Sequence, residues 1–375
     1  MGIYGFVRTE VRCFAASGNA ASAHGRTDNK PVQVHDQGED VTMTRTFLKT
    51  LTAAALATVA ITAVTGAAMA ETLRDNWCSD VNIRFFAGGA EGDAFASIVY
   101  NGAVQAAKDT GAQVDYVFSG WSSEKMIQQL REAIGAAPDG IAMMGHPGNA
   151  AIMPLAEEAS AAGIKMMYQN VPVDEVTAKF GGGYVGAQQK PQGRALGEEA
   201  IRRFGLKAGD VAIVMSDWSQ IERAERELGT LEAFEAAGLK VVKLQSPQEL
   251  GTDPNTGIPV ITAAITANPD VKIIAYPGGQ PLGNAATYMQ AAGKNPGDVI
   301  NIGFDTSPQI VEAFENGWVQ LTSDQQPFLQ GYMPVLSLCQ QVVYGLGALN
   351  VDTGAGFVTP DNYKAVADLA KEGLR

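Results

Sequence analysis

Histidine and cysteine, which bind most transition metals and supply many catalytic bases and nucleophiles, are scarce in this sequence. The 375 residues include three histidines and three cysteines, and after residue 70 only His146, Cys78 and Cys339 remain. The sequence therefore has neither a histidine cluster nor a C-x-x-C pair beyond that point, which excludes the usual zinc and thiol–disulfide exchange sites. We predict that the protein has no metal and no cofactor.

Motifs for phosphate binding, nucleophilic catalysis and calcium binding are also missing. The sequence contains no P-loop, no G-x-S-x-G nucleophile elbow and no D-x-D-x-D-G loop. The glycine-rich stretch GGAEG at 88–92 departs from the G-x-G-x-x-G pattern of dinucleotide binding. Ser-His and Cys-His pairs would both require His146, which we interpret as a turn residue because Gly145 and Pro147 flank it. We therefore predict that the chain is not an enzyme.

Basic residues are fewer than acidic ones, and long apolar runs are missing after residue 71. The chain has 27 Lys and Arg against 40 Asp and Glu, a net charge of -13 at pH 7. Such a field repels phosphate backbones and anionic lipid surfaces, so we predict no nucleic-acid partner. No apolar run after residue 71 approaches the roughly 20 residues that a membrane helix needs.

A secretory signal begins at Met43 instead of at residue 1. Arg45 and Lys49 precede an apolar, alanine-rich stretch at 51–63, and the sequence AMA follows at 68–70. A positive segment, a short apolar core and small residues before the cleavage point are typical of a cleavable export signal.

We accordingly predict that residues 43–70 are a signal peptide and that the mature chain begins at Glu71. Export places the protein in the periplasm of a Gram-negative bacterium. We interpret residues 1–42 as a non-native upstream extension from an over-long gene model, and the true start codon stays open.

Short apolar runs alternate with longer amphipathic stretches along the mature sequence. The predicted strands are 82–87, 113–118, 140–144, 164–168, 211–215, 241–244, 271–276 and 299–303. Helical patterns between them include 94–110, 123–136, 150–162 and 221–237. Strands alternating with helices indicate right-handed βαβ units and parallel sheets. A glycine triplet at 181–183 divides the chain into two similar halves, so we predict an α/β fold of two Rossmann-like lobes with parallel sheets.

Polar and aromatic side chains follow the predicted strands in both halves. Ligands bind at the carboxyl ends of the strands in doubly wound lobes, so we expect a site in these loops. Carboxylates, amides and a guanidinium bind the hydroxyl groups of an uncharged polyol, and aromatic rings pack on the C–H faces of a sugar. The candidate ligand-binding residues are Asp93, Phe95, Trp121, Asn170, Trp218, Arg226, Asp305 and Gln325.

Several of these candidates have a simpler structural interpretation. An aspartate after a strand is often a helix cap, and Arg226 lies in a charged helical stretch whose face would be solvated. Trp121 and Trp218 would be core residues. The same residue types recur at equivalent loop positions in both halves, which favours the binding site.

Two motifs late in the chain carry a more specific resemblance. The sequences NIGFDTSP at 301–308 and DQQPF at 324–328 resemble those of periplasmic sugar-binding proteins of ABC transporters, the ribose/galactose-binding class of type I periplasmic binding proteins. The similarity begins at about Val81 and extends to the C-terminus. It includes Phe95, the pair Asn101-Gly102, the sequence GYVG at 183–186, and Arg226 with Gly229.

The resemblance implies two lobes joined by three crossover segments, with the ligand trapped between the lobes when they close. The implied crossovers lie near 183–187, 322–326 and 349–353. The implied N-terminal lobe comprises 78–183 and 327–350, with a helix at 328–345, and the C-terminal lobe comprises 184–326 and 351–375.

The same resemblance returns Cys339 to the lobe that contains Cys78. An even pair of cysteines in an oxidising compartment can form a disulfide. Two buried free thiols are the alternative, and the sequence leaves both open.

Three loops depart from the pattern of the family. Asn170-Val171 replaces the usual Asp-Arg after the fourth strand, and PGG at 277–279 stands where sugar binders present Asn or Asp. The sequence GHPGN at 145–149 replaces a Pro-Thr-Asp type of loop. These departures disfavour ribose, glucose and galactose, and they favour a different monosaccharide or a sugar alcohol.

The resemblance implies a monomeric solute-binding protein that captures a monosaccharide or sugar alcohol and delivers it to the permease subunits of an ABC importer. The alternative function is a sugar or furanosyl-autoinducer sensor that presents its ligand to a membrane receptor. A repressor that shares the ligand-binding core is excluded, because no DNA-binding headpiece precedes the core and the net charge is negative.

Overall fold

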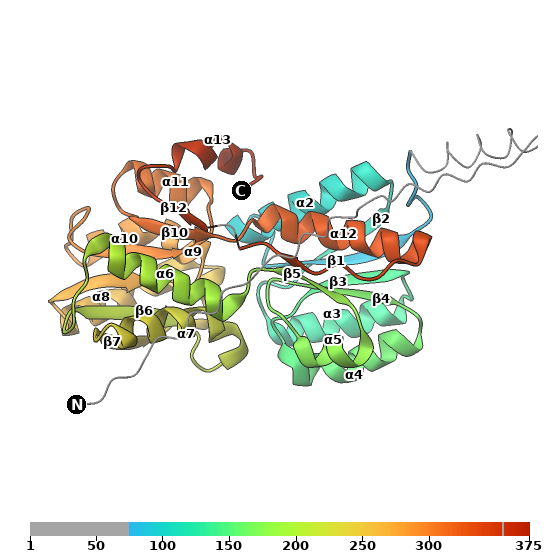
Figure 1. Cartoon of the computed structure of the whole chain (residues 1–375), viewed down its shortest axis with the longest axis horizontal. Coiled ribbons are helices and arrows are strands. Elements are labelled where there is room, and N and C mark those ends of the chain that lie inside the picture. The colour runs from blue at the N-terminus through green and yellow to red at the C-terminus, as the bar shows by residue number, and fades with distance from the viewer. Residues whose placement is uncertain (1–74, 355) are drawn as a thin grey trace, which may run out of the picture. The chain divides into compact units, whose positions relative to one another are not determined.

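Two six-stranded sheets organise the part of the chain that the structure describes (Figure 1). The structure is a computed structural model, and it describes residues 75–354 and 356–375, without the side chains of 221–223. The predicted upstream extension (1–42) and signal peptide (43–70) lie outside the described residues. No described helix is long and apolar enough to cross a membrane.

The first sheet has the strand order β11-β5-β4-β3-β1-β2, and its strand pairs are all parallel. Its strands are β1 (Asn82–Gly88), β2 (Gln113–Phe118), β3 (Gly140–Met144), β4 (Lys165–Gln169), β5 (Gly183–Gly186) and β11 (Val351–Asp352). Two helices pack on one face, α2 (Ala94–Thr110) and α12 (Pro327–Tyr344). The opposite face is covered by α3 (Ser123–Gly135), α4 (Gly148–Ala161) and α5 (Asp174–Phe180) (Figure 1).

The second sheet repeats this plan, with the order β12-β10-β9-β8-β6-β7 and one antiparallel edge strand, β12. Its strands are β6 (Val211–Ser216), β7 (Lys240–Gln245), β8 (Val271–Ala275), β9 (Ile300–Phe304), β10 (Leu321–Asp324) and β12 (Gly356–Val358). One face carries α6 (Gln189–Phe204) and α7 (Ile221–Ala236). The remaining helices are α8 (Gly257–Ala267), α9 (Gly279–Gly283), α10 (Ala285–Ala291), α11 (Pro308–Glu315) and α13 (Lys364–Lys371), and two 3-10 turns are η1 (Gln248–Gly251) and η2 (Pro254–Thr256).

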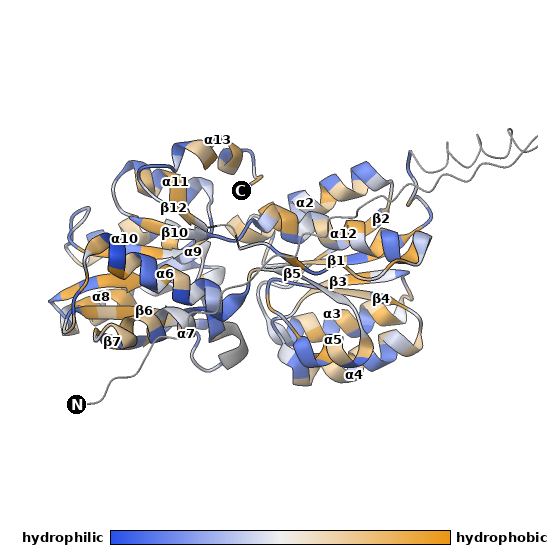
Figure 2. Cartoon of the chain, in the orientation of Figure 1, coloured by the Kyte–Doolittle hydropathy of each residue, from blue (hydrophilic) through white to orange (hydrophobic). Residues whose placement is uncertain are grey.

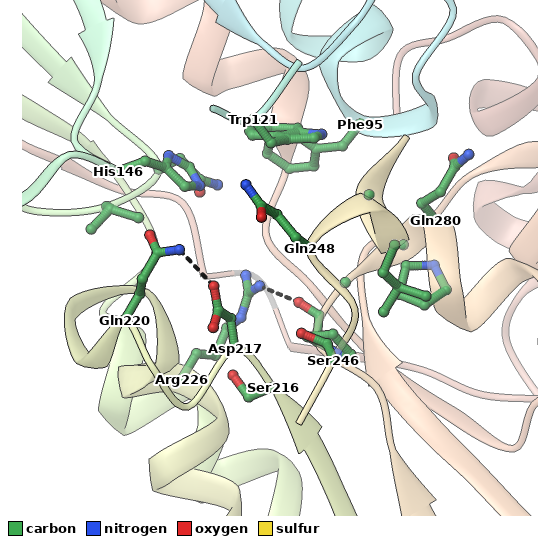
Figure 3. A pocket seen from close by; sticks show the side chains of 18 of the residues that line it. Phe95, Trp121, His146, Ser216, Asp217, Gln220, Arg226, Ser246, Gln248 and Gln280 are labelled. Atoms are coloured by element: carbon green, nitrogen blue, oxygen red, sulfur yellow. Dashed lines mark hydrogen bonds between the residues drawn. The ribbon is translucent and has the colours of Figure 1, made fainter. Parts of the chain in front are cut away.

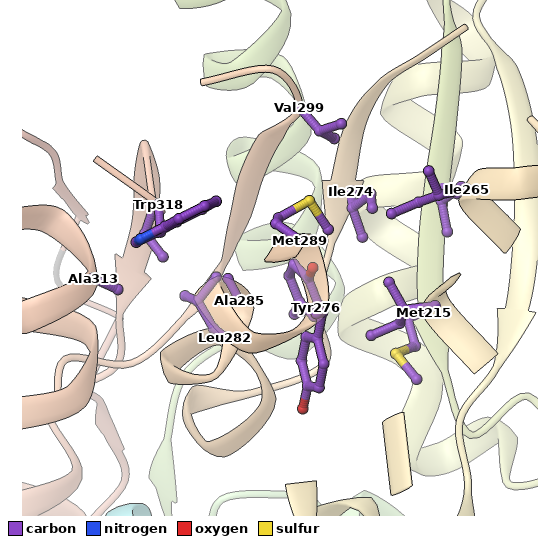
Figure 4. Packing of buried hydrophobic residues seen from close by; sticks show 14 of the residues in the cluster. Met215, Ile265, Ile274, Tyr276, Leu282, Ala285, Met289, Val299, Ala313 and Trp318 are labelled. Carbon is purple, nitrogen blue, oxygen red and sulfur yellow. The ribbon is translucent and has the colours of Figure 1, made fainter. Parts of the chain in front are cut away.

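Alternate residues of each strand face opposite sides of the sheet. In β6, Ile213 and Met215 pack under α8, α10 and α11, whereas Ala212 and Val214 pack under α6 and α7. Figure 4 shows part of the first of these clusters, with Met215 near Ile265 of α8. Because helices cover both faces, central strands such as β3 and β6 are continuous buried runs. The helices around them carry both polar and apolar residues (Figure 2). This burial explains why the central strands were predictable from sequence.

The chain passes between the two sheets three times: after β5, after β10 and after β11. Two lobe boundaries predicted from the sequence fall inside or beside strands. Position 183 is the first residue of β5, which pairs with β4, and positions 351–352 form β11, which extends the first sheet. Both strands are short, and β5 begins and ends with glycine, so no apolar run marks them as strands.

Cys78 and Cys339 form a disulfide between the segment that precedes β1 and helix α12. Both cysteines are fully buried in the core between α2, α12 and the first sheet. The bond therefore ties the first described residues to a helix that joins this lobe only late in the chain. Of the two possibilities that the sequence leaves open, the structure contains the disulfide.

Candidate ligand-binding site

The carboxyl ends of the strands of both sheets surround one pocket of about 220 Å³. The loops that follow β1, β2, β3 and β4 of the first sheet line one part of it, and the loops that follow β6, β7, β8 and β9 of the second sheet line the other. Parallel strands place their carboxyl ends at the same edge of a sheet, which explains why loops so distant in sequence meet here.

Three rings form an aromatic wall on the side of the first sheet. The rings of Phe95 and Trp121 lie 5.9 Å apart between centroids, and those of Trp121 and His146 lie 5.2 Å apart. Figure 3 shows this wall, with the side chain of Gln248 pointing into the space between Trp121 and Arg226. The interpretation of His146 as only a turn residue was therefore incomplete, because its ring lines the pocket beside Trp121.

The conformation of the loop after β2 places Trp121 in this wall. Trp121 has a φ of +60°, which a non-glycine residue seldom adopts. A Cβ atom at Gly88 or Gly89 would lie within 3.0 Å of the indole ring, so these glycines leave the space that the ring fills. The GGAEG stretch thus accommodates an aromatic side chain.

Asp93 connects the aromatic wall to helix α2. Its Oδ1 accepts hydrogen bonds from the backbone amides of Phe95 and Ala96, which makes Asp93 the N-cap of α2. Its Oδ2 accepts a hydrogen bond of 3.0 Å from the indole nitrogen of Trp121. Burial raises the pKa of the Asp93 carboxyl group, and these three hydrogen bonds oppose the rise.

A chain of hydrogen bonds crosses the base of the pocket from the first lobe to the second. Asn170 donates through Nδ2 to the side-chain oxygens of Gln325 and Gln330, at 3.3 and 3.1 Å. Gln325 in turn donates to Oδ1 of Asp305 at 2.5 Å. Because Gln325 lies in the crossover after β10, this chain joins both lobes through the segment between them.

Both carboxylate oxygens of Asp305 accept hydrogen bonds, and one of these bonds comes from a backbone amide. Its Oδ2 accepts a hydrogen bond of 2.7 Å from the amide of Gly279, in the PGG loop where the family presents a polar side chain. Burial raises the pKa of Asp305, while the positive charge of Arg226 lowers it by a smaller amount. The carboxylate is therefore held rigidly at the pocket with both oxygens hydrogen-bonded.

Arg226 of α7 is fixed on three sides. Its Nε donates to Glu227 at 3.2 Å, its Nη2 donates to the carbonyl oxygen of Pro277 at 2.7 Å, and its guanidinium lies 4.2 Å from the ring centroid of Phe304. Its Nη1 is buried without a hydrogen-bond partner among the described residues. A buried donor without a partner is costly, which makes Nη1 a candidate contact for a ligand.

Of the eight candidate residues, the structure places seven at the pocket: Asp93, Phe95, Trp121, Asn170, Arg226, Asp305 and Gln325. Trp218 does not line it. Its ring packs against the cluster between α6, α7 and the second sheet, and Lys243 lies 5.2 Å from its centroid. Trp218 is half-buried against this cluster, whereas its neighbour Asp217 lines the pocket, so the structure favours the core interpretation for Trp218.

A second set of polar lining residues was not predicted from the sequence. They are mostly glutamines, together with a buried glutamate and a serine: Gln189, Gln220, Gln248, Gln280, Glu227 and Ser246. Gln248 lies on η1 after β7, and Gln220 donates a hydrogen bond of 2.6 Å to Asp217 (Figure 3). Apart from Glu227, which lies within α7, their position soon after strand ends was the available signal. Among the described residues, no group of three or more His, Cys, Asp or Glu is arranged to hold a metal ion.

Comparison with known proteins identifies the family to which this chain belongs. Residues 84–345 match the model of the periplasmic binding protein domain. The chain belongs to the periplasmic binding protein family. This family is one of binding proteins, in agreement with the prediction that the chain is not an enzyme.

Two curated relatives carry sugar names. The D-ribose/D-allose-binding protein of Pseudomonas aeruginosa is 28% identical over 232 residues, which cover 61% of this chain and 66% of the relative. The xylose/arabinose-binding protein of Sulfolobus acidocaldarius is 25% identical over 250 residues, which cover 63% of this chain and 60% of the relative. The chain thus spans slightly under two thirds of the length of these relatives.

Solved structures show the same fold. A carbohydrate transporter from Acidothermus cellulolyticus 11B, in complex with myo-inositol, is 28% identical with a TM-score of 0.68, covering 79% of this chain and 99% of that one. A solute-binding protein of an ABC transporter from Burkholderia graminis C4D1M, in complex with D-arabinose, is 22% identical with a TM-score of 0.69, covering 77% and 98%. The predicted α/β fold of two lobes, a type I periplasmic binding protein, is confirmed.

Proposed function

We propose that this protein is a periplasmic solute-binding protein that captures one uncharged monosaccharide or sugar alcohol and delivers it to the permease subunits of an ABC importer. The observation that carries the proposal is the pocket itself: polar side chains from both lobes face an aromatic wall across a cavity of about 220 Å³. Few buried sites combine amides, carboxylates and a guanidinium with aromatic rings, and a polyol has matching hydroxyl groups and C–H faces.

The proposed roles follow from the contacts of each residue. Arg226 donates through Nη1 to a ligand hydroxyl or ring oxygen, since its other nitrogens have protein partners. Asp305, Asn170 and Gln325 bind further hydroxyl groups at the base of the pocket. Phe95 and Trp121 pack on the ring of the ligand. Asp93 holds the indole of Trp121 and keeps lone pairs for a ligand hydroxyl.

The names of the relatives support the ligand class. The relatives named above are a ribose/allose-binding and a xylose/arabinose-binding protein, and the Acidothermus cellulolyticus structure contains myo-inositol. All of these ligands are small and uncharged. The PGG loop, where a backbone amide and Asp305 replace a side chain, supports a ligand other than ribose, glucose or galactose.

A thermal-shift screen tests this function. The purified protein is unfolded and refolded to remove carried-over ligand and is then heated with pentoses, hexoses, sugar alcohols and a furanosyl autoinducer. A ligand at 100 times its dissociation constant stabilises the fold by about 2.7 kcal/mol, which raises the melting temperature measurably. A shift with one polyol supports the proposal, and a flat response to the whole panel contradicts it.

A further inference from the structure

The free nitrogen of Arg226 is poorly suited to an anionic ligand. A carboxylate or phosphate group binds arginine best through two parallel N–H···O bonds from adjacent nitrogens. Glu227 already holds Nε, and the carbonyl oxygen of Pro277 already holds Nη2. Both nitrogens of the Nε/Nη2 fork therefore already have protein partners. The nitrogen without a protein partner is Nη1, which can donate to a hydroxyl oxygen of a ligand.

Glu227 also balances the charge of Arg226. Its side chain is 3% exposed, and its Oε1 lies 3.2 Å from Nε of Arg226. Its Oε2 accepts a hydrogen bond of 3.1 Å from the hydroxyl group of Ser216, so both oxygens are held in place. The buried pair of Glu227 and Arg226 has no net charge, so an anionic ligand at Nη1 meets a cation that is already neutralised.

No other Lys or Arg lines the pocket in the described part of the chain, whereas five lining residues are acidic: Asp93, Glu124, Asp217, Glu227 and Asp305. Of these acids, Glu227 is the one that bonds directly to the guanidinium. It therefore has the largest effect on the charge that a ligand meets at Nη1.

We infer that Glu227 is a specificity-determining residue: it makes the Arg226 position accept a hydroxyl group and reject a carboxylate or phosphate group. The inference rests on the proposed function and extends it, because it assigns the selection against acidic sugars to one buried side chain. Uncharged monosaccharides and sugar alcohols bind, whereas uronic acids and sugar phosphates do not.

The variant Glu227→Gln isolates the charge. Glutamine has nearly the shape of glutamate, its oxygen can accept the bond from Arg226, and its amide can donate to Ser216, whose hydroxyl both donates and accepts. The contacts are kept and the pair gains a net positive charge. Glu225→Gln is the matched control, since Glu225 is an exposed residue of the same helix that does not line the pocket.

The test is the ratio of affinities for neutral and acidic sugars, measured by isothermal titration calorimetry at low salt. The neutral panel is xylose, glucose, galactose, arabinose and myo-inositol, and the acidic panel is glucuronate and galacturonate. The wild-type protein should prefer its tightest neutral ligand to the tightest uronate by about a hundredfold or more. Glu227→Gln should reduce that ratio by about tenfold, and Glu225→Gln should leave it unchanged.

Three results would overturn the inference in distinguishable ways. A ratio that is the same in Glu227→Gln as in Glu225→Gln removes Glu227 as the determinant and leaves the proposed function intact. A wild-type protein that binds a uronate as tightly as any neutral sugar overturns the inference even if the Gln variant does not fold. A wild-type protein that binds neither panel removes the proposed function and the inference together.

Discussion

Asp93 is both a helix cap and a pocket residue. One of its carboxylate oxygens caps α2, and the other accepts the indole N–H of Trp121. From the sequence these were alternatives, because the residue type and its place after a strand fit either one. The link to Trp121 was not predictable, since the indole comes from the next loop and reaches Asp93 through an unusual backbone conformation. The place of Trp218 was not predictable either, because only the folded loop shows that its side chain packs against the core cluster instead of the pocket.

At the residue scale, the first prediction concerns Arg226. Arg226→Ala removes a buried donor, Nη1, that has no protein partner in the described part of the chain, and it leaves Glu227 buried without its cation. We expect the affinity for the cognate ligand to fall by about 1.5–3 kcal/mol, as for the loss of a charged hydrogen bond. Isothermal titration calorimetry measures this change in affinity. Trp218→Phe is the control and should bind normally, and an unchanged affinity in Arg226→Ala would remove Arg226 from the site.

The second prediction concerns the pH dependence of stability through Asp305. Burial raises the pKa of Asp305 above its ordinary value of 3.8, so the native state holds this proton more tightly than the unfolded state. Its contribution to the free energy of unfolding is full below pH 3.8 and is lost as the pH rises through the raised pKa. The variant Asp305→Asn has no carboxyl group at this position, so it does not lose this stability as the pH rises. Melting temperatures without ligand, measured from acidic to neutral pH, should therefore decrease less in the variant, and two parallel curves would contradict this.

At the element scale, the predictability of each segment depended on its apolar pattern. Helix α2 (Ala94–Thr110) and strands β2 (Gln113–Phe118) and β3 (Gly140–Met144) have the bounds that the sequence predicted. Alternate residues of β2 pack on the core, and β3 is a fully buried run. Four strands were not predicted: β5, β10, β11 and β12. They have four residues or fewer, and pairing with a neighbouring strand, instead of a long apolar run, makes them strands.

The third prediction concerns the contact between α6 and α7. Gly193 of α6 packs so closely on α7 that a Cβ atom would overlap the carbonyl oxygen of Arg226. Gly193→Ala must push the helices apart at Arg226, the residue that we propose binds the ligand. We expect a loss of about 1–3 kcal/mol of stability, as for overpacking, together with weaker ligand binding. Denaturant unfolding and calorimetry measure the two effects.

Gly135→Ala is the control for this change, because nothing lies within 4 Å of a Cβ atom there. It should change neither stability nor affinity by a comparable amount. Equal behaviour of the two variants would mean that the close approach at Gly193 does not position Arg226.

The fourth prediction concerns the disulfide between Cys78 and Cys339. The two residues are 261 positions apart in sequence, so the bond closes a long loop in the unfolded chain. Replacing both cysteines by alanine should lower the free energy of unfolding by about 2–4 kcal/mol. A reducing agent should lower the melting temperature of the wild-type protein and leave that of the double variant unchanged. A wild-type melting temperature that does not respond to full reduction would contradict the prediction.

At the scale of the whole molecule, the site depends on two lobes that alternate along the chain. The aromatic wall comes from the first lobe, Arg226 and Asp305 come from the second, and Gln325 lies in a crossover between them. The topology brought seven of the eight candidates together, since most of them follow strand ends at the same edge of each sheet and Arg226 lies on the helix that follows β6. Four other lining glutamines were not predicted, because only the folded loops show which side chains turn inward: Gln189, Gln220, Gln248 and Gln280.

The central claim is that the pocket between the lobes binds one uncharged polyol, and isothermal titration calorimetry of the refolded, ligand-free protein tests it most directly. We predict one site per chain for at least one monosaccharide or sugar alcohol, with a dissociation constant near 1 μM, about -8 kcal/mol. Arg226→Ala should abolish or greatly weaken the same isotherm. The account is contradicted if no neutral polyol binds, or if one binds with the same affinity to Arg226→Ala as to the wild-type protein.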